Sequence, residues 1–208
     1  IYSRKWSLFT FVLSAFVLFF YIKEGLFSIN EWLYHANGDS LKNYFNVLQA
    51  AKHSDGFWLN NLNYPFGEQL FFLDSQPLFA KLIGMLNLES YTIGMVNSLP
   101  LLSISLTTIP IFLIQRELKI ALVANIITAI IISFLAPQIA RGSIHFALAY
   151  GFYIPMLIYL IMARIHAEFS RYLLIIVLIL TFSFLHPYYL LIGTVLLTSF
   201  LLYHLFFQ

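Results

Sequence analysis

Long apolar runs with almost no charge dominate this chain and decide the solvent in which it can fold. The first run extends from about Trp6 to Ile22, and others cover about 91–114, 120–140, 144–163 and 172–207. Of the 208 residues, 61% are hydrophobic and only 10% are charged, whereas a soluble domain carries about 25% charged residues. Runs of this length can cross a bilayer. The sequence therefore predicts an all-α, polytopic membrane protein whose partner is the lipid bilayer.

The last run, Tyr172–Phe207, is long enough for two helices and is interrupted at His186–Pro187. We therefore expect about six transmembrane helices in a single domain, residues 1–208. The 14 residues before His186 reach about 21 Å as a helix, which is less than the roughly 30 Å of hydrocarbon. Irregular backbone at membrane depth must line a cavity or be buried in protein. We therefore expect the break at His186–Pro187 to point into a pocket that opens outward.

The basic residues predict the orientation of the chain, because cytoplasmic ends of membrane helices are enriched in Lys and Arg. With the N-terminus inside, the inner segments hold Arg4, Lys5, Arg116, Lys119, Arg164 and Arg171. The short turn between the third and fourth runs, on the opposite side, holds only Arg141. We expect a multi-pass protein of the bacterial inner or plasma membrane, with a cytoplasmic N-terminus and the first loop on the other face.

Polar residues are concentrated in this first loop, residues 23–90, and above all between Asn37 and Leu86. Asp39–Ser40 can cap a helix over 41–52, and Asp74 can cap a second helix over 77–88, which has proline in its first turn. The apolar positions of the first of these helices repeat at helical spacing: Leu41, Tyr44, Phe45, Leu48 and Ala51. Both helices are predicted to lie at the membrane surface.

Three motifs in the first loop resemble a known family. They are Gly38–Asp39 with Tyr44, the segment Asn63–Tyr64–Pro65–Phe66–Gly67–Glu68, and Asp74–Ser75–Gln76–Pro77–Leu78. With His186–Pro187–Tyr188–Tyr189, they resemble the N-terminal part of the GT-C superfamily of integral-membrane glycosyltransferases, which includes protein O-mannosyltransferases, aminoarabinose transferases and oligosaccharyltransferase catalytic subunits. Gln76 stands where that family has the first proline of a Pro-Pro-Leu segment. Because the chain starts without Met and stops directly after an apolar run, we expect it to be part of a longer protein.

The resemblance implies transfer of a sugar from a polyprenyl-phosphate donor to an acceptor on the non-cytoplasmic side. It makes Asp39 the catalytic residue, and abstraction of a hydroxyl proton does need a carboxylate within hydrogen-bond reach. Stabilising the leaving phosphate needs cations or donors, for which Arg141, His145 and His186 are candidates. Further candidate substrate contacts are Asp74, Glu68 and Tyr64. The resemblance implies no definite cofactor, because family members differ in whether they need a divalent metal.

Each of these residues also has a purely structural interpretation. The alternatives are a helix cap for Asp39 or Asp74, a loop hydrogen bond for Glu68, a bond to a neighbouring helix for His186, and interfacial anchoring for Arg141, His145 and Tyr64. The sequence does not choose between the two interpretations.

Two other functional classes stay open, namely a transporter, flippase or channel subunit, and an inactive scaffold. A transporter should carry polar residues near the middle of several spans. Here the interruptions are Asn97, Asn125, Gln138 and the break at His186, which favours a site at the membrane surface. A net charge of +2 with scattered basic residues argues against a nucleic-acid partner. The absence of cysteine excludes disulfides and thiolate metal sites.

Overall fold

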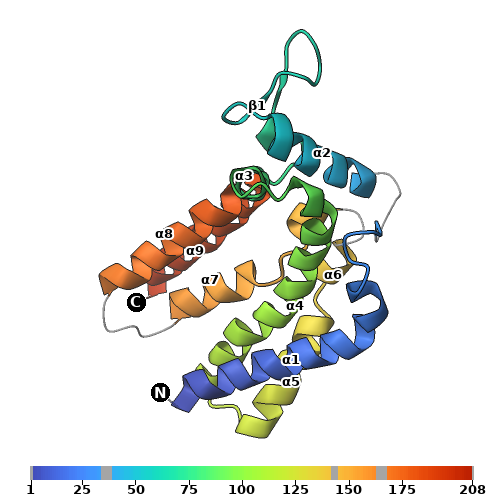
Figure 1. Cartoon of the computed structure of the whole chain (residues 1–208). Coiled ribbons are helices and arrows are strands. Elements are labelled where there is room, and N and C mark those ends of the chain that lie inside the picture. The colour runs from blue at the N-terminus through green and yellow to red at the C-terminus, as the bar shows by residue number, and fades with distance from the viewer. Residues whose placement is uncertain (1, 34–38, 142–144, 163–167, 208) are drawn as a thin grey trace.

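The computed structural model describes residues 2–33, 39–141, 145–162 and 168–207. It is an assembly of α-helices with one two-stranded sheet (Figure 1), so the predicted all-α class is confirmed. The elements in chain order are α1 (Tyr2–Leu26), α2 (Asp39–His53), β1 (Trp58–Leu59), β2 (Glu68–Gln69), η1 (Leu70–Phe72), α3 (Pro77–Met85), η2 (Glu89–Tyr91), α4 (Thr92–Glu117), α5 (Leu122–Phe134), α6 (Gln138–Arg141), η3 (Phe146–Leu148), α7 (Tyr153–Met162), α8 (Glu168–Ser183) and α9 (Pro187–Phe207). Gly38, the Gly142–Ser143 turn and Arg164 lie outside the described residues.

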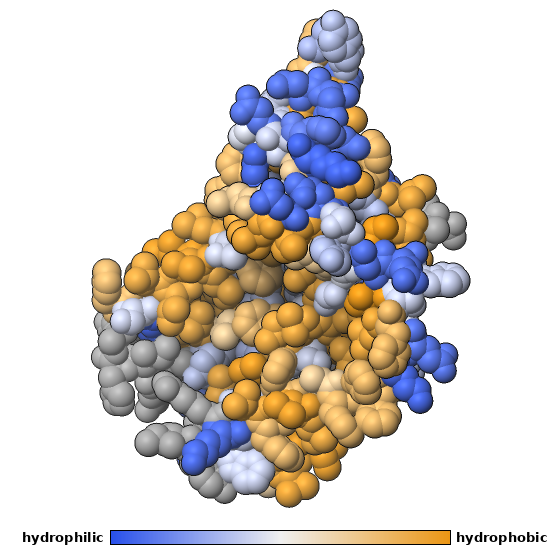
Figure 2. Space-filling view, in the orientation of Figure 1, coloured by the Kyte–Doolittle hydropathy of each residue, from blue (hydrophilic) through white to orange (hydrophobic). Residues whose placement is uncertain are grey.

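Within the described ranges, three helical stretches are long and apolar enough to cross a bilayer, namely Lys5–Leu26, Glu89–Glu117 and Leu122–Arg141. Shorter apolar helices follow at Phe146–Met162, Phe169–Ser183 and Pro187–Tyr203. Figure 2 shows apolar residues covering much of the helical body, whereas hydrophilic residues gather over α2 and the hairpin of β1 and β2. A surface so rich in exposed Leu, Ile, Val and Phe requires lipid as its solvent. The chain is therefore a membrane protein.

The prediction of one continuous helix over residues 144–163 is wrong. The described part of this run is a short η3, an irregular stretch over 149–152, and α7, which has 10 residues. Tyr150 holds the irregular stretch in place, because its backbone N–H donates to the Tyr189 hydroxyl at 3.3 Å and its own hydroxyl donates to Gln76 Oε1. These partners are distant in sequence, so apolar periodicity could not reveal the break. The predicted break at His186–Pro187 is confirmed, since α8 ends at Ser183 and α9 begins at Pro187.

The two helices predicted in the first loop are present as α2 and α3, but the prediction that Asp74 caps α3 is wrong. The cap position is held by Gln76, whose side chain makes no capping bond. Asp74 and Gln76 both have left-handed backbone, with φ of 53° and 49°, and Ser75 between them donates from Oγ to the Leu70 carbonyl at 2.8 Å. This turn directs the Asp74 carboxylate away from α3 and toward the break between α8 and α9.

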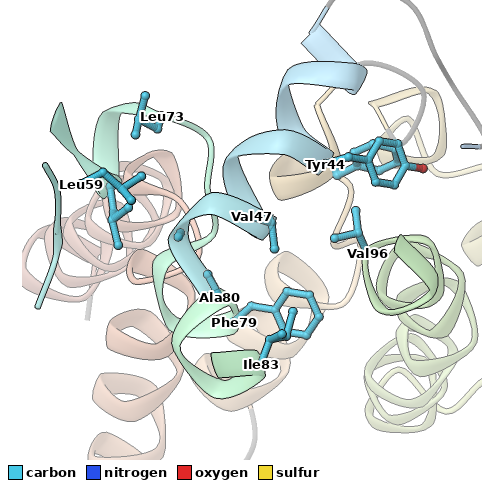
Figure 3. Close-up of a cluster of buried hydrophobic side chains, with 11 residues drawn as sticks. Tyr44, Val47, Leu59, Leu73, Phe79, Ala80, Ile83 and Val96 are labelled. Atoms are coloured by element: carbon cyan, nitrogen blue, oxygen red, sulfur yellow. The ribbon is translucent and has the colours of Figure 1, made fainter. Parts of the chain in front are cut away.

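A hydrophobic cluster joins the first loop to the membrane helices (Figure 3). It packs α2 and α3 against α4 and η3 through Tyr44, Val47, Ala50, Leu59, Leu70, Leu73, Phe79, Ala80, Ile83, Val96 and Phe146. The predicted apolar face of α2 is divided between two environments. Tyr44 is buried in this cluster, whereas Leu41 and Phe45 are 49% and 47% exposed and remain available to a membrane surface.

Asn97 shows why a polar residue inside α4 is structural. Its Nδ2 donates to the carbonyls of Ile29 at 2.7 Å and Trp32 at 2.9 Å, and its Oδ1 accepts from the Tyr44 hydroxyl. The amide therefore holds the segment that follows α1 and the middle of α2 on the same turn of α4. Asn125 similarly donates to the Phe112 carbonyl at 3.1 Å, between α5 and α4. Both side chains bind other helices or connections of the protein.

Gly84→Ala is expected to destabilise the packing of α3 on α2. A Cβ at Gly84 would lie 2.5 Å from the backbone oxygen of Ala51, and a backbone atom cannot rotate away as a side chain can. Overpacking of this kind costs about 1–3 kcal/mol, so the unfolding midpoint of the detergent-solubilised protein should fall by several degrees. Met85→Ala, at a neighbouring residue that is 77% exposed, is the control. An unchanged midpoint for Gly84→Ala would contradict the close helix contact.

Candidate functional site

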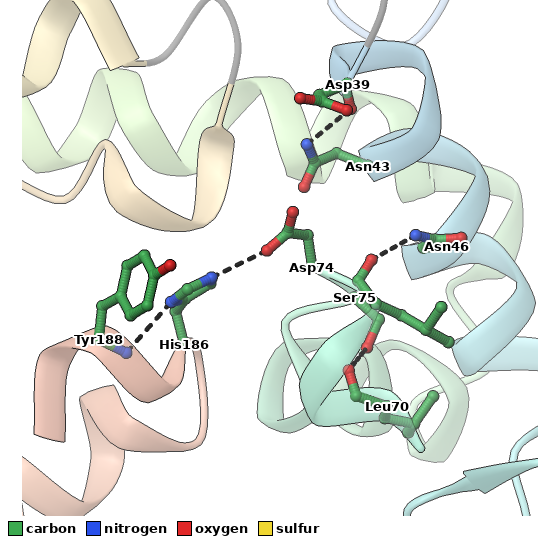
Figure 4. A network of polar contacts seen from close by, with 9 residues as sticks. Asp39, Asn43, Asn46, Leu70, Asp74, Ser75, His186 and Tyr188 are labelled. Atoms are coloured by element: carbon green, nitrogen blue, oxygen red, sulfur yellow. Dashed lines mark hydrogen bonds and ion pairs between the residues drawn. The ribbon is translucent and has the colours of Figure 1, made fainter. Parts of the chain in front are cut away.

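The centre of the candidate site is a contact between Asp74 and His186, two residues that the sequence predicted separately as substrate contacts. His186 Nε2 lies 2.8 Å from Asp74 Oδ1, as Figure 4 shows. The side chain of His186 is 10% exposed and that of Asp74 is 23% exposed. The pair therefore lies at the edge of the protein interior. Asp74 Oδ1 is hydrogen-bonded to His186, while the carboxylate remains partly exposed.

Two further contacts bring these distant segments together. The backbone N–H of Leu78, in the first turn of α3, donates at 3.0 Å to the carbonyl of Phe184, the residue that follows α8. The Phe184 ring packs against Phe57 and Phe71 of the first loop, with centroid distances of 5.7 and 5.6 Å, and those two rings also contact each other at 5.2 Å. The first loop is thereby fixed to the break between α8 and α9 by a backbone hydrogen bond, an aromatic cluster and the Asp74–His186 hydrogen bond.

The hydrogen bonds of His186 define its tautomer. Its Nδ1 accepts the backbone N–H of Tyr188 at 3.2 Å, so that nitrogen carries no proton and Nε2 donates to Asp74. The Tyr188 ring also packs edge-on against the imidazole, with a centroid distance of 4.7 Å. Because both ring nitrogens are engaged, His186 is suited to hold Asp74 in position and poorly suited to bind a phosphate oxygen directly.

The Asp74 carboxyl is held in its ionised form. The hydrogen bond from His186 lowers the pKa of Asp74 below its ordinary value, and this outweighs the opposing effect of partial burial. Electrostatic interactions with His186, Lys42 and His145 lower the pKa of Asp74 further. Both Lys42, at the start of α2, and the sequence candidate His145 are therefore close enough to Asp74 to interact with it electrostatically. Asp74 is therefore a carboxylate at neutral pH.

Asp39 is the first residue of α2, and its side chain is exposed. Its backbone carbonyl accepts from Asn43 Nδ2 at 2.8 Å, which fixes the first turn of the helix. In Figure 4, Asp39 and Asn43 lie on the side of Asp74 that faces away from His186. Two of the three candidate carboxylates of the first loop, Asp39 and Asp74, therefore lie in one region, with the more exposed Asp39 at the helix terminus.

A polar pocket lies beside this region and contains Arg141. It has a volume of about 370 Å³. We call it the polar pocket for its polar lining residues, which are Gln138 and Arg141 of α6, Tyr150, and Tyr188 and Tyr189 of α9, although Pro137, Leu148, Ile154 and Ile192 also line it. Tyr188, which packs against His186, therefore links the pocket to the Asp74–His186 pair. Arg141 is exposed at the end of α6, where its guanidinium can meet an anionic ligand.

An apolar groove adjoins the polar pocket, and the two share Tyr150. The groove has a volume of about 190 Å³ and lies between α3, α4 and α8, among Leu78, Phe79, Leu82, Leu99, Leu102, Ser103, Leu106, Tyr150, Phe152, Phe182 and Leu185. Its walls are almost wholly hydrocarbon, so it suits an apolar chain and not a hydrated headgroup. A polar pocket and an apolar groove in this arrangement can hold the two ends of one amphiphile.

Glu68 and Tyr64 are the sequence candidates that lie elsewhere. Glu68 is in β2, paired with Leu59 of β1, and Tyr64 is 88% exposed in the connection between the strands, which projects from the helical body (Figure 1). Their proposed substrate contacts stay predictions. In the described part of the chain, no three His, Asp or Glu side chains are grouped as a metal site would require.

Sequence reasoning did not single out Tyr188, Tyr150 or Gln76 as site residues. Gln76 is fully buried and accepts from the Tyr150 hydroxyl, which connects the turn that carries Asp74 to the wall between the pocket and the groove. The available signals were weak, namely a Gln before proline and tyrosines within otherwise apolar runs.

The comparisons with known proteins identify a family without a described activity. Residues 9–208 match the sequence profile of a family described as a domain of unknown function, DUF6311. The comparisons with curated proteins and with solved structures found no match. Because the match covers nearly the whole chain, the protein belongs to the DUF6311 family.

Proposed function

We propose that this protein is a membrane glycosyltransferase that moves a sugar from a polyprenyl-phosphate donor to an acceptor on the non-cytoplasmic side. The observation that carries the proposal is the adjacency of three features at one end of the helices. These are two carboxylates, Asp39 and Asp74, a polar pocket with Arg141, and the apolar groove that shares Tyr150 with that pocket. A donor that is a sugar phosphate at one end and a hydrocarbon chain at the other needs this combination.

The proposed membrane arrangement has about six crossings, made by α1, α4, α5 with α6, η3 with α7, α8 and α9. Both chain ends lie on the side of the molecule away from α2 and the hairpin (Figure 1). Lys5, Arg116, Lys119 and Arg171 belong to helix ends or turns that the positive-inside rule assigns to the cytoplasm. The first loop then faces the periplasm or cell exterior, with the N-terminus in the cytoplasm.

In the proposed reaction, Asp39 takes the proton of the acceptor hydroxyl as that oxygen forms a bond to the anomeric carbon. The bond between that carbon and the donor phosphate oxygen breaks, and the phosphate leaves with the electron pair. Arg141 stabilises the developing charge on the phosphate. Asp74, held by His186, contacts the sugar or acceptor from the side opposite to Asp39. Proton transfer of this kind contributes about 10²–10⁴-fold to rate.

The polar residues within the helices favour this proposal over a transporter. Asn97 and Asn125 use their amide donors on backbone carbonyls of neighbouring elements, so both side chains help to hold those elements together. The ionisable residues that come together lie at the first-loop end, as a site at the membrane surface requires.

Binding and turnover of the donor test the proposal. The full-length protein in neutral-lipid nanodiscs is titrated with polyprenyl phosphate, and a panel of polyprenyl-phosphate sugars is then assayed for release of polyprenyl phosphate. Arg141→Gln should weaken binding about tenfold, because it removes a charge-assisted contact to phosphate. Leu102→Trp, which fills the apolar groove, should weaken it independently.

Arg116→Gln is the matched control, because it removes one arginine from the last turn of α4 that does not line the pocket. Binding that is equal in all variants, together with no release from any sugar in the panel, would refute the transferase proposal. Binding without release would identify a lipid-phosphate carrier instead and would equally overturn it.

A further inference from the structure

A second apolar groove lies between α7, α8 and α9. It has a volume of about 130 Å³, and its lining residues are Ile161, Arg171, Tyr172, Ile175, Ile176, Leu197, Phe200 and Leu201. Ile175 is 3% exposed, whereas Ile176 and Leu201 are 53% and 60% exposed. The groove therefore has a buried wall and edges that open to the lipid around the helices, which is the shape that an acyl chain can enter laterally.

Arg171 lines this groove, and its guanidinium contacts the ring of the adjacent Tyr172. Arg171 lies in the first turn of α8, with its guanidinium carbon 5.1 Å from the centre of the Tyr172 ring. Its Nη2 donates to the Tyr172 hydroxyl at 3.4 Å. The groove thus combines hydrocarbon walls with a guanidinium, whose planar fork of donors matches phosphate oxygens.

The groove lies at the end of the molecule opposite to the first loop. In Figure 1, α8 begins near the C-terminus and far from α2. The same end carries Lys5 near the start of α1 and Arg116 in the last turn of α4. This excess of basic residues suits the cytoplasmic leaflet, whose anionic lipids attract cations near the membrane surface. Basic pockets between membrane helices on that side are typical sites for anionic lipid headgroups.

We propose that this groove binds one anionic glycerophospholipid, with its phosphate at Arg171 and an acyl chain along α8 and α9. The charge at Arg171 selects an anionic headgroup over a zwitterionic one, and Ile175 and Leu197 contact the chain. The bound lipid fills the space between α7, α8 and α9 and thereby stabilises their packing. The site is separate from the proposed donor pocket and does not depend on sugar transfer.

The test measures lipid retention by the full-length protein in nanodiscs that contain equal amounts of phosphatidylglycerol and phosphatidylcholine. The protein is extracted gently, and the lipids that remain bound are counted by native mass spectrometry. Phosphatidylglycerol should be retained about fivefold over phosphatidylcholine, the effect of one interfacial cation. Arg171→Gln should bring this ratio close to one, and Arg171→Lys should keep most of it. Leu201→Trp, which fills the groove, should reduce retention of both lipids.

Lys5→Gln is the matched control, because Lys5 is exposed at the same end and does not line the groove. It should leave the ratio unchanged. Equal retention of both lipids by the unaltered protein would overturn the proposal, as would an equal loss of preference in Lys5→Gln and Arg171→Gln. Binding of polyprenyl phosphate should be unaffected by Arg171→Gln, so a failure of this site is distinguishable from a failure of the donor site.

Discussion

Asp39→Asn in the full-length protein is expected to lower sugar transfer by at least about 100-fold while leaving the fold intact. The amide keeps the size of the side chain but cannot accept the acceptor proton, and general-base catalysis contributes about 10²–10⁴-fold. Folding should be unaffected because the side chain is exposed and Asn43 Nδ2 donates to the backbone carbonyl of Asp39, which the substitution leaves in place. The measurement is release of polyprenyl phosphate at saturating donor, together with the unfolding midpoint in detergent.

Asp55→Asn is the matched control for this change. It removes an equally exposed carboxylate of the first loop and should retain full activity. If Asp39→Asn and Asp55→Asn transfer sugar equally well, Asp39 is only the start of α2 and the assignment of the base to it is wrong. If only KM rises, Asp39 binds the acceptor and takes no proton, which also contradicts its proposed role.

The sequence predicted a membrane protein because the apolar composition and the length of the apolar runs are determined by the bilayer and not by contacts between distant residues. Every membrane-spanning helix must form all its backbone hydrogen bonds internally and present apolar side chains to the hydrocarbon. Long uncharged runs such as 91–114 could therefore be identified directly from the sequence. The break at His186–Pro187 was predictable for a similarly local reason, because proline disfavours helix at the preceding residue. Local rules thus located α1, α4 and the corner between α8 and α9.

The rest depended on contacts between distant segments. Residues 144–163 have the composition of one helix, and the break after η3 is stabilised by Gln76 and Tyr189, which are 74 and 39 residues from Tyr150. Asp74 preceded a proline helix and resembled a cap, but its left-handed backbone turns the carboxylate to His186, 112 residues away. Spacing along the chain cannot predict such partners, because loop closure brings together residues that no local pattern relates.

Asp74→Asn is expected to reduce transfer about as strongly as Asp39→Asn, whereas His186→Gln should be tolerated. The Asn amide oxygen can still accept from His186 Nε2, so the loop stays fixed while the carboxylate charge is lost. A Gln at 186 can still donate to Asp74 and should retain activity within about tenfold. His186→Phe cannot donate and leaves the half-buried carboxylate without this partner, which costs about 1–3 kcal/mol. Its kcat should fall to the level of Asp74→Asn.

The combination of Asp74→Asn with His186→Phe decides whether the histidine acts through the carboxylate. If His186 is a positioning residue, the double variant is no less active than Asp74→Asn alone, because residues that act as one unit are strongly non-additive. Independent binding of phosphate by His186 would make the two losses multiply. It would also make His186→Gln as damaging as His186→Phe, since the imidazole itself would then be required. Either result would replace the Asp74–His186 unit with two separate substrate contacts.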